Sequence, residues 1–243
     1  MKSIQAMNNA KAFIVSLLEN KRGNSEIEIR MRVSDAQLDK CIHCLQKRAI
    51  FSICFDMFRY VANRVLNLCS CDPNWSDKSE TTFVDHQQPQ GRKRFLPNSM
   101  TEYISKTCLQ RKDFQIHAQV LHEGIQIRIA HNKEEDIQNS KKEKQDITQI
   151  RHIQRHSFIH KNYIRFDASK IIQTSQALYD KQEPCAIQNE IELELINLNP
   201  LYMQTSKPLE VHAESMICKI LDIACMIHGV KTADLDDLSC KPV

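Results

Sequence analysis

Strict alternation of charged and apolar residues marks two segments of the chain, from Glu26 to Arg32 and from Glu190 to Leu195. Side chains two positions apart point to the same face of a β-strand, so each segment is predicted to be a strand with one ionic face and one apolar face. Short segments that carry β-branched or aromatic residues between polar turns predict further antiparallel strands. These segments are 81–84, 92–96, 102–109, 114–120, 125–131, 151–159 and 163–169.

Apolar residues at helical spacing predict helices on either side of this run of strands. The helices lie at 1–22, 35–47, 50–68 and 210–229, and Ser34 is suited to be the N-cap of the second. The terminal helices are expected to cover the apolar outer face of the sheet. The segment 132–149 has scarcely an apolar residue, which indicates a solvated loop within the sheet, and the tail 231–243 is expected to fray.

Length and composition indicate a single domain over residues 1–243, since 42% of the residues are apolar and only four are glycine. No apolar run approaches the roughly 18 to 20 residues that cross a bilayer, and no secretory signal is evident. We therefore expect an intracellular protein with reduced cysteines and no membrane contact. The 33 basic and 30 acidic residues leave a net charge of +3, which is too small to indicate nucleic-acid binding by the whole surface. Any site for a polyanion must be local.

The charged strand faces have two interpretations. In the first, the charged faces meet water while the apolar faces pack on helices, as in many antiparallel sheets. In the second, the charged faces face one another inside a closed barrel. Glu190, Glu192 and Glu194 favour the barrel, because like charges crowded on one strand repel unless a cation or basic side chains offset them. Glutamates clustered inside a barrel would provide hard oxygen ligands for Mg²⁺ or Mn²⁺, and arginines and lysines opposite them would hold a highly charged anion.

The two acidic strands, with the sequence Ile-Arg-Phe-Asp-Ala-Ser-Lys at 164–170 shortly before the second, carry a family resemblance. The chain resembles the fungal and protist type of mRNA 5′-triphosphatase, the metal-dependent capping-enzyme subunit of the triphosphate tunnel superfamily, from about Glu26 to Ile196. The resemblance implies an α+β fold, in which an antiparallel eight-stranded β-barrel has ionic residues facing inward and helices packed outside. It also implies metal-dependent hydrolysis of the γ-phosphate at the 5′-triphosphate end of nascent mRNA, leaving a 5′-diphosphate end.

The resemblance also implies roles for single residues. The ligands for Mg²⁺ or Mn²⁺ would be Glu26, Glu28 and Glu194. Glu190 and Glu192 would orient metal-bound water or basic neighbours, and Asp167 would fill an adjoining polar position of the site. Glu134, or Glu135 in the alternative register, would position the attacking water. The phosphate-binding residues would be Arg94 (or Arg92), Lys106, Arg151, Arg155 and Arg165.

One position departs from the family pattern. In the segment 151–157, Ile153 stands where the family has a phosphate-binding lysine. Losing one charge-assisted contact would cost about 1.5 to 3 kcal/mol of phosphate binding. This departure keeps open a non-catalytic subunit that binds RNA 5′ ends.

Other functions and partners can be weighed at the same level. A related tunnel phosphohydrolase, acting on nucleoside triphosphate, thiamine triphosphate or inorganic polyphosphate, is the second alternative. The capping role implies a nuclear protein that works beside mRNA guanylyltransferase, and a homodimer is possible within the family. Cys41 and Cys44 have no second pair at zinc-finger spacing, and the chain contains no phosphate-binding Gly-x-x-x-x-Gly-Lys loop, which excludes a P-loop nucleotidase.

Overall fold

The computed structural model of the protein describes residues 2–21, 25–46, 75–89, 91–116, 124–136, 147–160, 164–175, 186–196 and 209–228. Within these ranges, eight antiparallel strands form a closed barrel in the order β1-β5-β4-β3-β2-β6-β7-β8. The strands are β1 (Ser25–Val33), β2 (Trp75–Gln88), β3 (Gly91–Phe95), β4 (Thr101–Ile116), β5 (Ile125–Asp136), β6 (Gln149–His160), β7 (Ile164–Ser175) and β8 (Ala186–Leu195). The described helices are α1 (Lys2–Glu19), α2 (Asp35–Gln46) and α6 (Leu209–Ile227). The predicted α+β barrel is confirmed.

The ring of strands closes because β1 pairs with both β5 and β8. Residues directly opposite in an antiparallel pair point to the same face of the sheet. Glu28 lies opposite Glu194, and Glu194 lies opposite Arg165 on the next strand, so the charged residues of β1, β7 and β8 share one face. That face is the inside of the barrel, as predicted.

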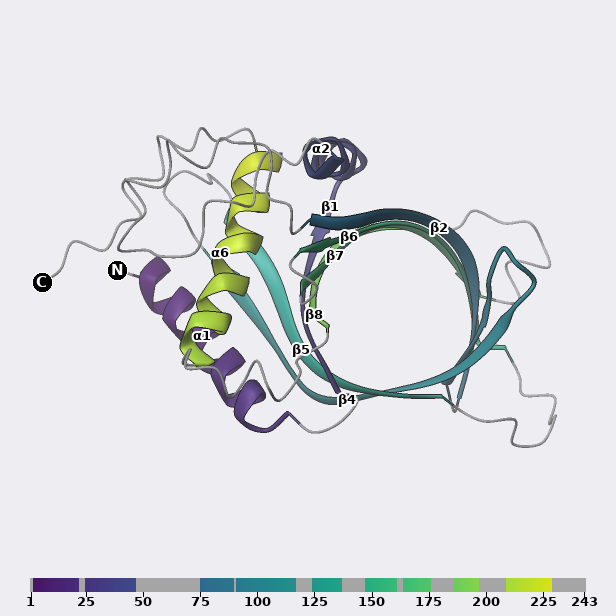
Figure 1. Ribbon diagram of the computed structural model, residues 1–243, viewed down its shortest axis with the longest axis horizontal. Coiled ribbons are helices and arrows are strands. Elements are labelled where there is room, and N and C mark those ends of the chain that lie inside the picture. Colours follow the sequence, from purple (N-terminus) through teal and green to yellow (C-terminus); the bar gives the residue numbers. More distant parts are fainter. Residues whose placement is uncertain are drawn as a thin grey trace, which may run out of the picture.

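The apolar faces of the strands point outward and are covered by helices. Figure 1 shows α1 and α6 side by side against one flank of the barrel, with α2 outside the ring of strands near β1. Ile14 and Leu17 of α1 and Ile220 and Ile223 of α6 are fully buried. They pack in one core with outward-facing residues of the barrel, including Ile27, Ile29, Ile127, Ile129, Ile191 and Leu193. Removal of this apolar surface from water is the main force that holds the helices on the barrel.

Ser34 caps α2, as predicted. The backbone N–H of Gln37 donates to Ser34 Oγ at 3.3 Å, and the backbone N–H of Ser34 donates to Gln37 Oε1 at 2.9 Å. This reciprocal pair satisfies two backbone donors that have no partner within the helix. The cap therefore fixes the point at which the chain leaves β1 and turns into α2.

Several predicted boundaries were wrong. Two separate strands were predicted at 102–109 and 114–120. In the structure, Thr101–Ile116 is one continuous strand, β4, with a bulge between Cys108 and Gln110. The predicted loop at 132–149 is strand as far as Asp136 and again from Gln149, since side chains there face an ionic interior and need not be apolar. β2 begins at Trp75, earlier than predicted. The predicted helix 50–68 and tail 231–243 lie outside the described residues. Of the helices in the described ranges, none has the length and apolar character needed to cross a membrane.

Candidate functional site

The acidic part of the barrel interior comes from β1 and β8, which lie side by side although they are far apart in sequence. Their register places Glu28 opposite Glu194 and Arg30 opposite Glu192. Glu28, Glu192 and Glu194 are 4%, 6% and 4% exposed, so their charges are offset inside the protein rather than by bulk water. The surrounding ion pairs show how this is done.

Arg30 is the first of these counter-charges. Its guanidinium lies 3.2 Å from Glu28, 3.4 Å from Glu190 and 3.3 Å from Glu192. Burial lowers the pKa of Arg30, but the three carboxylates outweigh it and the net effect raises the pKa. Arg30 had no role in the sequence-based assignment, although it shares the alternating ionic face with Glu26 and Glu28.

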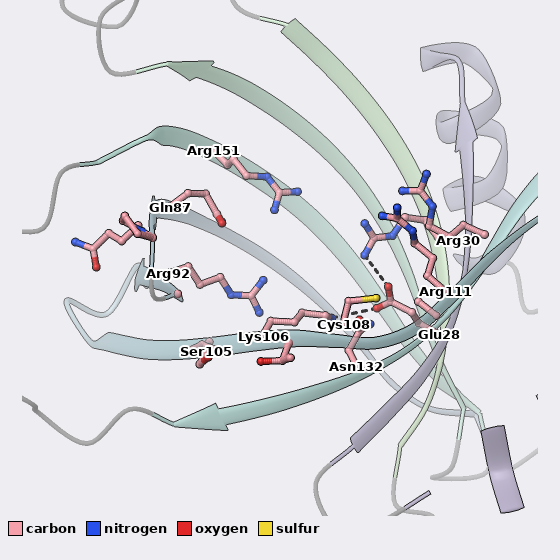
Figure 2. A pocket seen from close by; sticks show the side chains of 17 residues that line it. Glu28, Arg30, Gln87, Arg92, Ser105, Lys106, Cys108, Arg111, Asn132 and Arg151 are labelled. Carbon is pink, nitrogen blue, oxygen red and sulfur yellow. Dashed lines mark hydrogen bonds and ion pairs between the residues drawn. The ribbon is translucent and has the colours of Figure 1, made fainter. Parts of the chain in front are cut away.

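Lys106 supplies the second counter-charge from β4. Its Nζ lies 3.2 Å from Glu26, 3.1 Å from Glu28 and 3.2 Å from Glu134. Figure 2 shows this side chain extending along the tunnel wall toward Glu28. In this arrangement the lysine ammonium lies between two of the three glutamates predicted to bind a metal.

The three predicted metal ligands have the right chemistry for a hard divalent cation, since all of them are carboxylates. Burial, with repulsion from Glu192, raises the pKa of Glu28 to about 7. Burial raises the pKa of Glu194 to about 8, against the opposing effect of Arg165. Burial is the largest cause of both shifts, so each of these two carboxyl groups is harder to ionise here than in water. Among the described residues no three metal-ligating side chains converge on one point, and Lys106 Nζ lies 3.1 Å from the Glu28 carboxylate.

On the basic side, Arg94 and Arg92 of β3 both point into the barrel and are held by Asp85 of β2. Arg94 donates from Nε to Asp85 Oδ1 at 2.9 Å and from Nη2 to Oδ2 at 3.3 Å. Arg92 Nη1 lies 3.8 Å from Asp85 Oδ2. Asp85 is fully buried. The sequence-based strand ended at Val84 and missed Asp85, although the alternation of Phe83 with Asp85 was the available signal.

Arg155 and Arg165 are held in the same way by Asp167. The Arg155 and Arg165 guanidiniums lie 3.1 Å and 3.0 Å from Asp167 Oδ2. Ser157 Oγ donates to Asp167 at 2.6 Å, and Arg155 Nε donates to Ser169 Oγ at 3.1 Å. Asp167 is 1% exposed, and its carboxylate holds both arginines in position.

Glu134 and Glu135, the two alternatives for one predicted role, lie on opposite faces of β5. Glu134 faces the interior, where Arg92 Nη2 donates to it at 3.0 Å and Lys106 Nζ lies 3.2 Å away. Glu135 faces outward and pairs with Lys133 at 2.5 Å. Burial raises the pKa of Glu134, but Lys106 and Arg92 outweigh it and hold the pKa below its usual range. Glu134 is therefore an ionised acceptor inside the barrel.

Several donors lining the interior lack acceptors. The Nε atoms of Arg30, Arg92 and Arg151 and the Nδ2 atom of Asn132 are buried without a hydrogen-bond partner in the described part of the chain. All four residues line a cavity of about 480 Å³ together with Glu28 and Lys106 (Figure 2). Figure 2 shows Arg92 and Arg151 on the same side of this cavity, where β3 and β6 flank β2. An anion with several oxygens would satisfy these donors. Sequence reasoning missed Asn132, which lay in the predicted loop.

Ile153 lies on the interior face of β6 between Arg151 and Arg155, and it is 2% exposed. It packs with Phe83 and Ile171 in a small apolar cluster inside the barrel. The guanidinium carbons of Arg94 and Arg155 lie 4.3 Å and 5.5 Å from the centre of the Phe83 ring. Ile153, which stands where the resemblance predicts a lysine, therefore belongs to an apolar cluster that supports two arginines.

Comparison with solved structures shows the same fold in other proteins. The RNA triphosphatase Pct1 of S. pombe matches with a TM-score of 0.62 and 12% identity, over 90% of this chain and 91% of that one. Pct1 in complex with the Spt5 CTD matches with a TM-score of 0.59 and 12% identity, over 92% and 93% of the chains. The RNA triphosphatase domain of a trifunctional mimivirus mRNA capping enzyme matches with a TM-score of 0.51 and 13% identity, over 90% and 96%. No family model and no curated protein sequence matches the chain.

Proposed function

We propose that the protein hydrolyses the γ-phosphate of 5′-triphosphate RNA, in a reaction that depends on Mg²⁺ or Mn²⁺ and releases phosphate and 5′-diphosphate RNA. The observation that carries this proposal is the cavity beside the Glu28 carboxylate, where buried donors of Arg30, Arg92, Arg151 and Asn132 have no acceptor among the described residues. This combination suits an anion that is bound together with a cation. The structural neighbours of the same fold are named as RNA triphosphatases, which supports RNA as the source of the triphosphate.

The basic residues are proposed to hold the triphosphate oxygens. Arg92 and Arg94 reach the interior from β3, and Arg151 and Arg155 reach it from β6. Asp85 and Asp167 already fix three of these guanidiniums, so little side-chain freedom is lost when phosphate binds. Preformed positive charge stabilises the negative charge on the γ-phosphoryl oxygens in the transition state.

Glu134 is proposed to orient the attacking water. Its carboxylate accepts from Arg92 and Lys106 and stays ionised, so it can accept a further hydrogen bond from water in the cavity. Holding water in line with the γ-phosphorus lowers the barrier by positioning. Lys106 lies between Glu134 and Glu28, which links the water-orienting residue to the acidic strands.

Glu26, Glu28 and Glu194 are proposed to hold the divalent cation, with Glu190 and Glu192 keeping Arg30 in place beside them. When bound, the cation neutralises charge on the phosphate oxygens. Arg165 lies 2.5 Å from Glu194 and fixes the orientation of that carboxylate. The same proposal places the protein in the nucleus, beside a guanylyltransferase that uses the diphosphate end.

One observation favours a second function. Ile153 removes a charge from the phosphate-binding wall, which suits a subunit that binds RNA 5′ ends without hydrolysing them. Lys106 partly offsets this loss, because it brings an ammonium into the same cavity from β4. Hydrolysis therefore remains the function that the site supports best.

The test is release of phosphate from triphosphate-ended RNA and from ATP by purified protein with Mg²⁺, Mn²⁺ or EDTA. We expect metal-dependent release from RNA, lost in Glu28→Ala and Glu192→Ala, because each substitution removes a carboxylate from the acidic strands. Glu135→Ala is the matched control, since this glutamate lies on the outer face of the barrel. Folded protein that binds triphosphate-ended RNA but releases no phosphate with any metal would overturn the proposal in favour of the binding subunit.

A further inference from the structure

Cys108 is a nucleophilic side chain that the proposed reaction does not use. It lies in β4 just before the bulge, opposite Asn132 of β5, and Asn132 in turn lies opposite Glu26 of β1. This register turns the Cys108 thiol into the barrel, where it lines the cavity of about 480 Å³ (Figure 2). The thiol donates to the backbone carbonyl of Gln110 at 3.7 Å, across the bulge. A nucleophile therefore lies in the wall of the candidate site.

The bulge places Cys108 between two cations of its own strand. Lys106, two positions earlier, lies opposite Glu134 and faces inward. Arg111, three positions later, would face outward in a regular strand, but the extra residue of the bulge turns it inward, opposite Ala130. Along the inner face of β4, Cys108 thus has Lys106 on one side and Arg111 on the other. An anionic reagent that approaches this thiol meets a positive charge on each side.

The wall of the barrel is open beside Cys108. β3 pairs with only four residues of β4, ending at Ile104, and among the described residues no other strand continues along this edge of β4. Residues 107–113 are accordingly all exposed, so a small molecule can reach the thiol from solvent. Cys41 and Cys225 differ, because burial raises their pKa values to about 12 and about 11 and keeps them protonated.

The cavity around Cys108 suits an anion. Its lining carries one carboxylate, that of Glu28, and six basic side chains, which are Arg30, Arg92, Lys106, Arg111, Arg128 and Arg151. Asn132, directly opposite Cys108, is 4% exposed, and its Nδ2 atom has no acceptor among the described residues. An anionic group carried on the thiol would therefore find a buried donor and an excess of positive charge.

We propose that Cys108 is a site of reversible modification by glutathione disulfide, which attaches a tripeptide of net negative charge inside the cavity. The Cys108 thiolate attacks one sulfur of the disulfide and forms a new S–S bond, while the old S–S bond breaks. The second glutathione leaves as a thiolate and takes up the proton that Cys108 has lost, so Cys108 is oxidised and one half of the disulfide is reduced. The attached group fills the space for the triphosphate, a consequence that rests on the proposed function, and a free thiol reverses it.

The first test follows the modification of each cysteine by peptide mass mapping, with glutathione disulfide or with the cationic disulfide cystamine. Relative to the half-buried Cys44 of α2, we expect Cys108 to react at least about tenfold faster with glutathione disulfide than with cystamine, because its cavity attracts anions. Inorganic tripolyphosphate, added without metal, should protect Cys108 but not Cys44. A Cys108 that does not prefer the anionic disulfide, or that tripolyphosphate leaves unprotected, would overturn the proposal.

The second test measures binding of a fluorescent triphosphate-ended RNA by anisotropy without metal. Wild-type protein modified at Cys108 should bind the RNA at least about tenfold more weakly, and dithiothreitol should restore the affinity. Cys108→Ser, treated in the same way, should keep the affinity of its own untreated sample, because it has no thiol at this position. RNA binding that is unchanged after full modification of Cys108 would contradict a role for this thiol in closing the site.

The outcomes separate this inference from the proposed function. Phosphate release from RNA is measured in parallel with Mn²⁺ on unmodified wild-type protein. Protein that releases none would overturn the hydrolase, while the modification rates of Cys108 and their dependence on tripolyphosphate would still decide whether this thiol is the modified site.

Discussion

Arg92, Arg94 and Arg155 of the interior are held by aspartates before any ligand arrives. Arg94 has two hydrogen bonds to Asp85, and its guanidinium also lies over the ring of Phe83. Arg155 lies over the same ring at a longer distance. The apolar cluster around Ile153 thus stabilises two cations that a lysine at this position would repel.

We expect Phe83→Leu to weaken binding of triphosphate-ended RNA about threefold or more, because each cation–π contact contributes about 0.5 to 2 kcal/mol. The effect should lie in KM, since leucine keeps apolar volume but removes the ring that positions Arg94 and Arg155. Ile171→Leu is the matched control in the same cluster. Equal KM values for the two variants would argue against the positioning role.

Glu134 and Glu135 form a natural matched pair of neighbouring residues on opposite faces of β5. Glu134→Gln should lower kcat by about 100-fold or more if its carboxylate orients the attacking water. Glu135→Gln should leave kcat unchanged, because its side chain meets solvent and Lys133. Steady-state kinetics on triphosphate-ended RNA would measure both, and a similar kcat in the two variants would exclude Glu134 from the reaction.

The sequence predicted the orientation of individual side chains where charged and apolar residues alternate strictly along a strand. The alternation placed Glu28 and Glu192 on ionic strand faces, and the crowding of like charges on 190–194 favoured the barrel interior for those faces. Asp85 and Asn132 were missed, because an interior that accepts polar side chains looks like a turn or loop when few apolar residues flank it. Contacts such as the one between Lys106 and Glu134 depend on the register between strands, which the sequence does not encode in any local pattern.

At the level of elements, the outer layer of helices and the outward faces of the strands share the main apolar core. α6 has buried residues along almost its whole length, and α1 packs beside it. The outer faces of β1, β5 and β8 complete this core. The helices were predictable from apolar spacing, whereas the continuity of β4 was not, since its bulge interrupts the period-two pattern.

We expect Ile220→Ala in α6 to lower the free energy of unfolding by about 2 to 5 kcal/mol, because this side chain is fully buried between the helices and the barrel. Ile187→Ala is the same substitution at a position of β8 that is 58% exposed, and it should cost less than about 1 kcal/mol. Urea unfolding measures both. Equal destabilisation would contradict the packing of α6 on the barrel.

At the scale of the whole molecule, the fold buries Glu28 and Glu194, which raises the pKa of both, and a divalent cation beside them would favour their ionised forms. A divalent cation that binds only the folded protein therefore stabilises it. At a concentration about 100 times its Kd, the gain is about 2.7 kcal/mol.

We expect Mn²⁺ to raise the melting temperature by roughly 5 to 10 °C. Differential scanning fluorimetry with Mn²⁺ or EDTA measures this rise. Glu28→Gln should abolish it, whereas Glu135→Gln should retain it. A rise that persists in Glu28→Gln would place the cation elsewhere.

The pairing of β1 with β8 determines when the acidic part of the site can form during folding. Glu28 and Glu194 meet across the seam that closes the ring, so the acidic half of the site exists only after the last barrel strand has joined the first. A chain that has emerged from the ribosome only as far as β7 has all of its phosphate-binding arginines and an open edge on β1. Contacts between such distant segments form slowly. The activity should therefore appear late in folding, in a single step with closure of the ring.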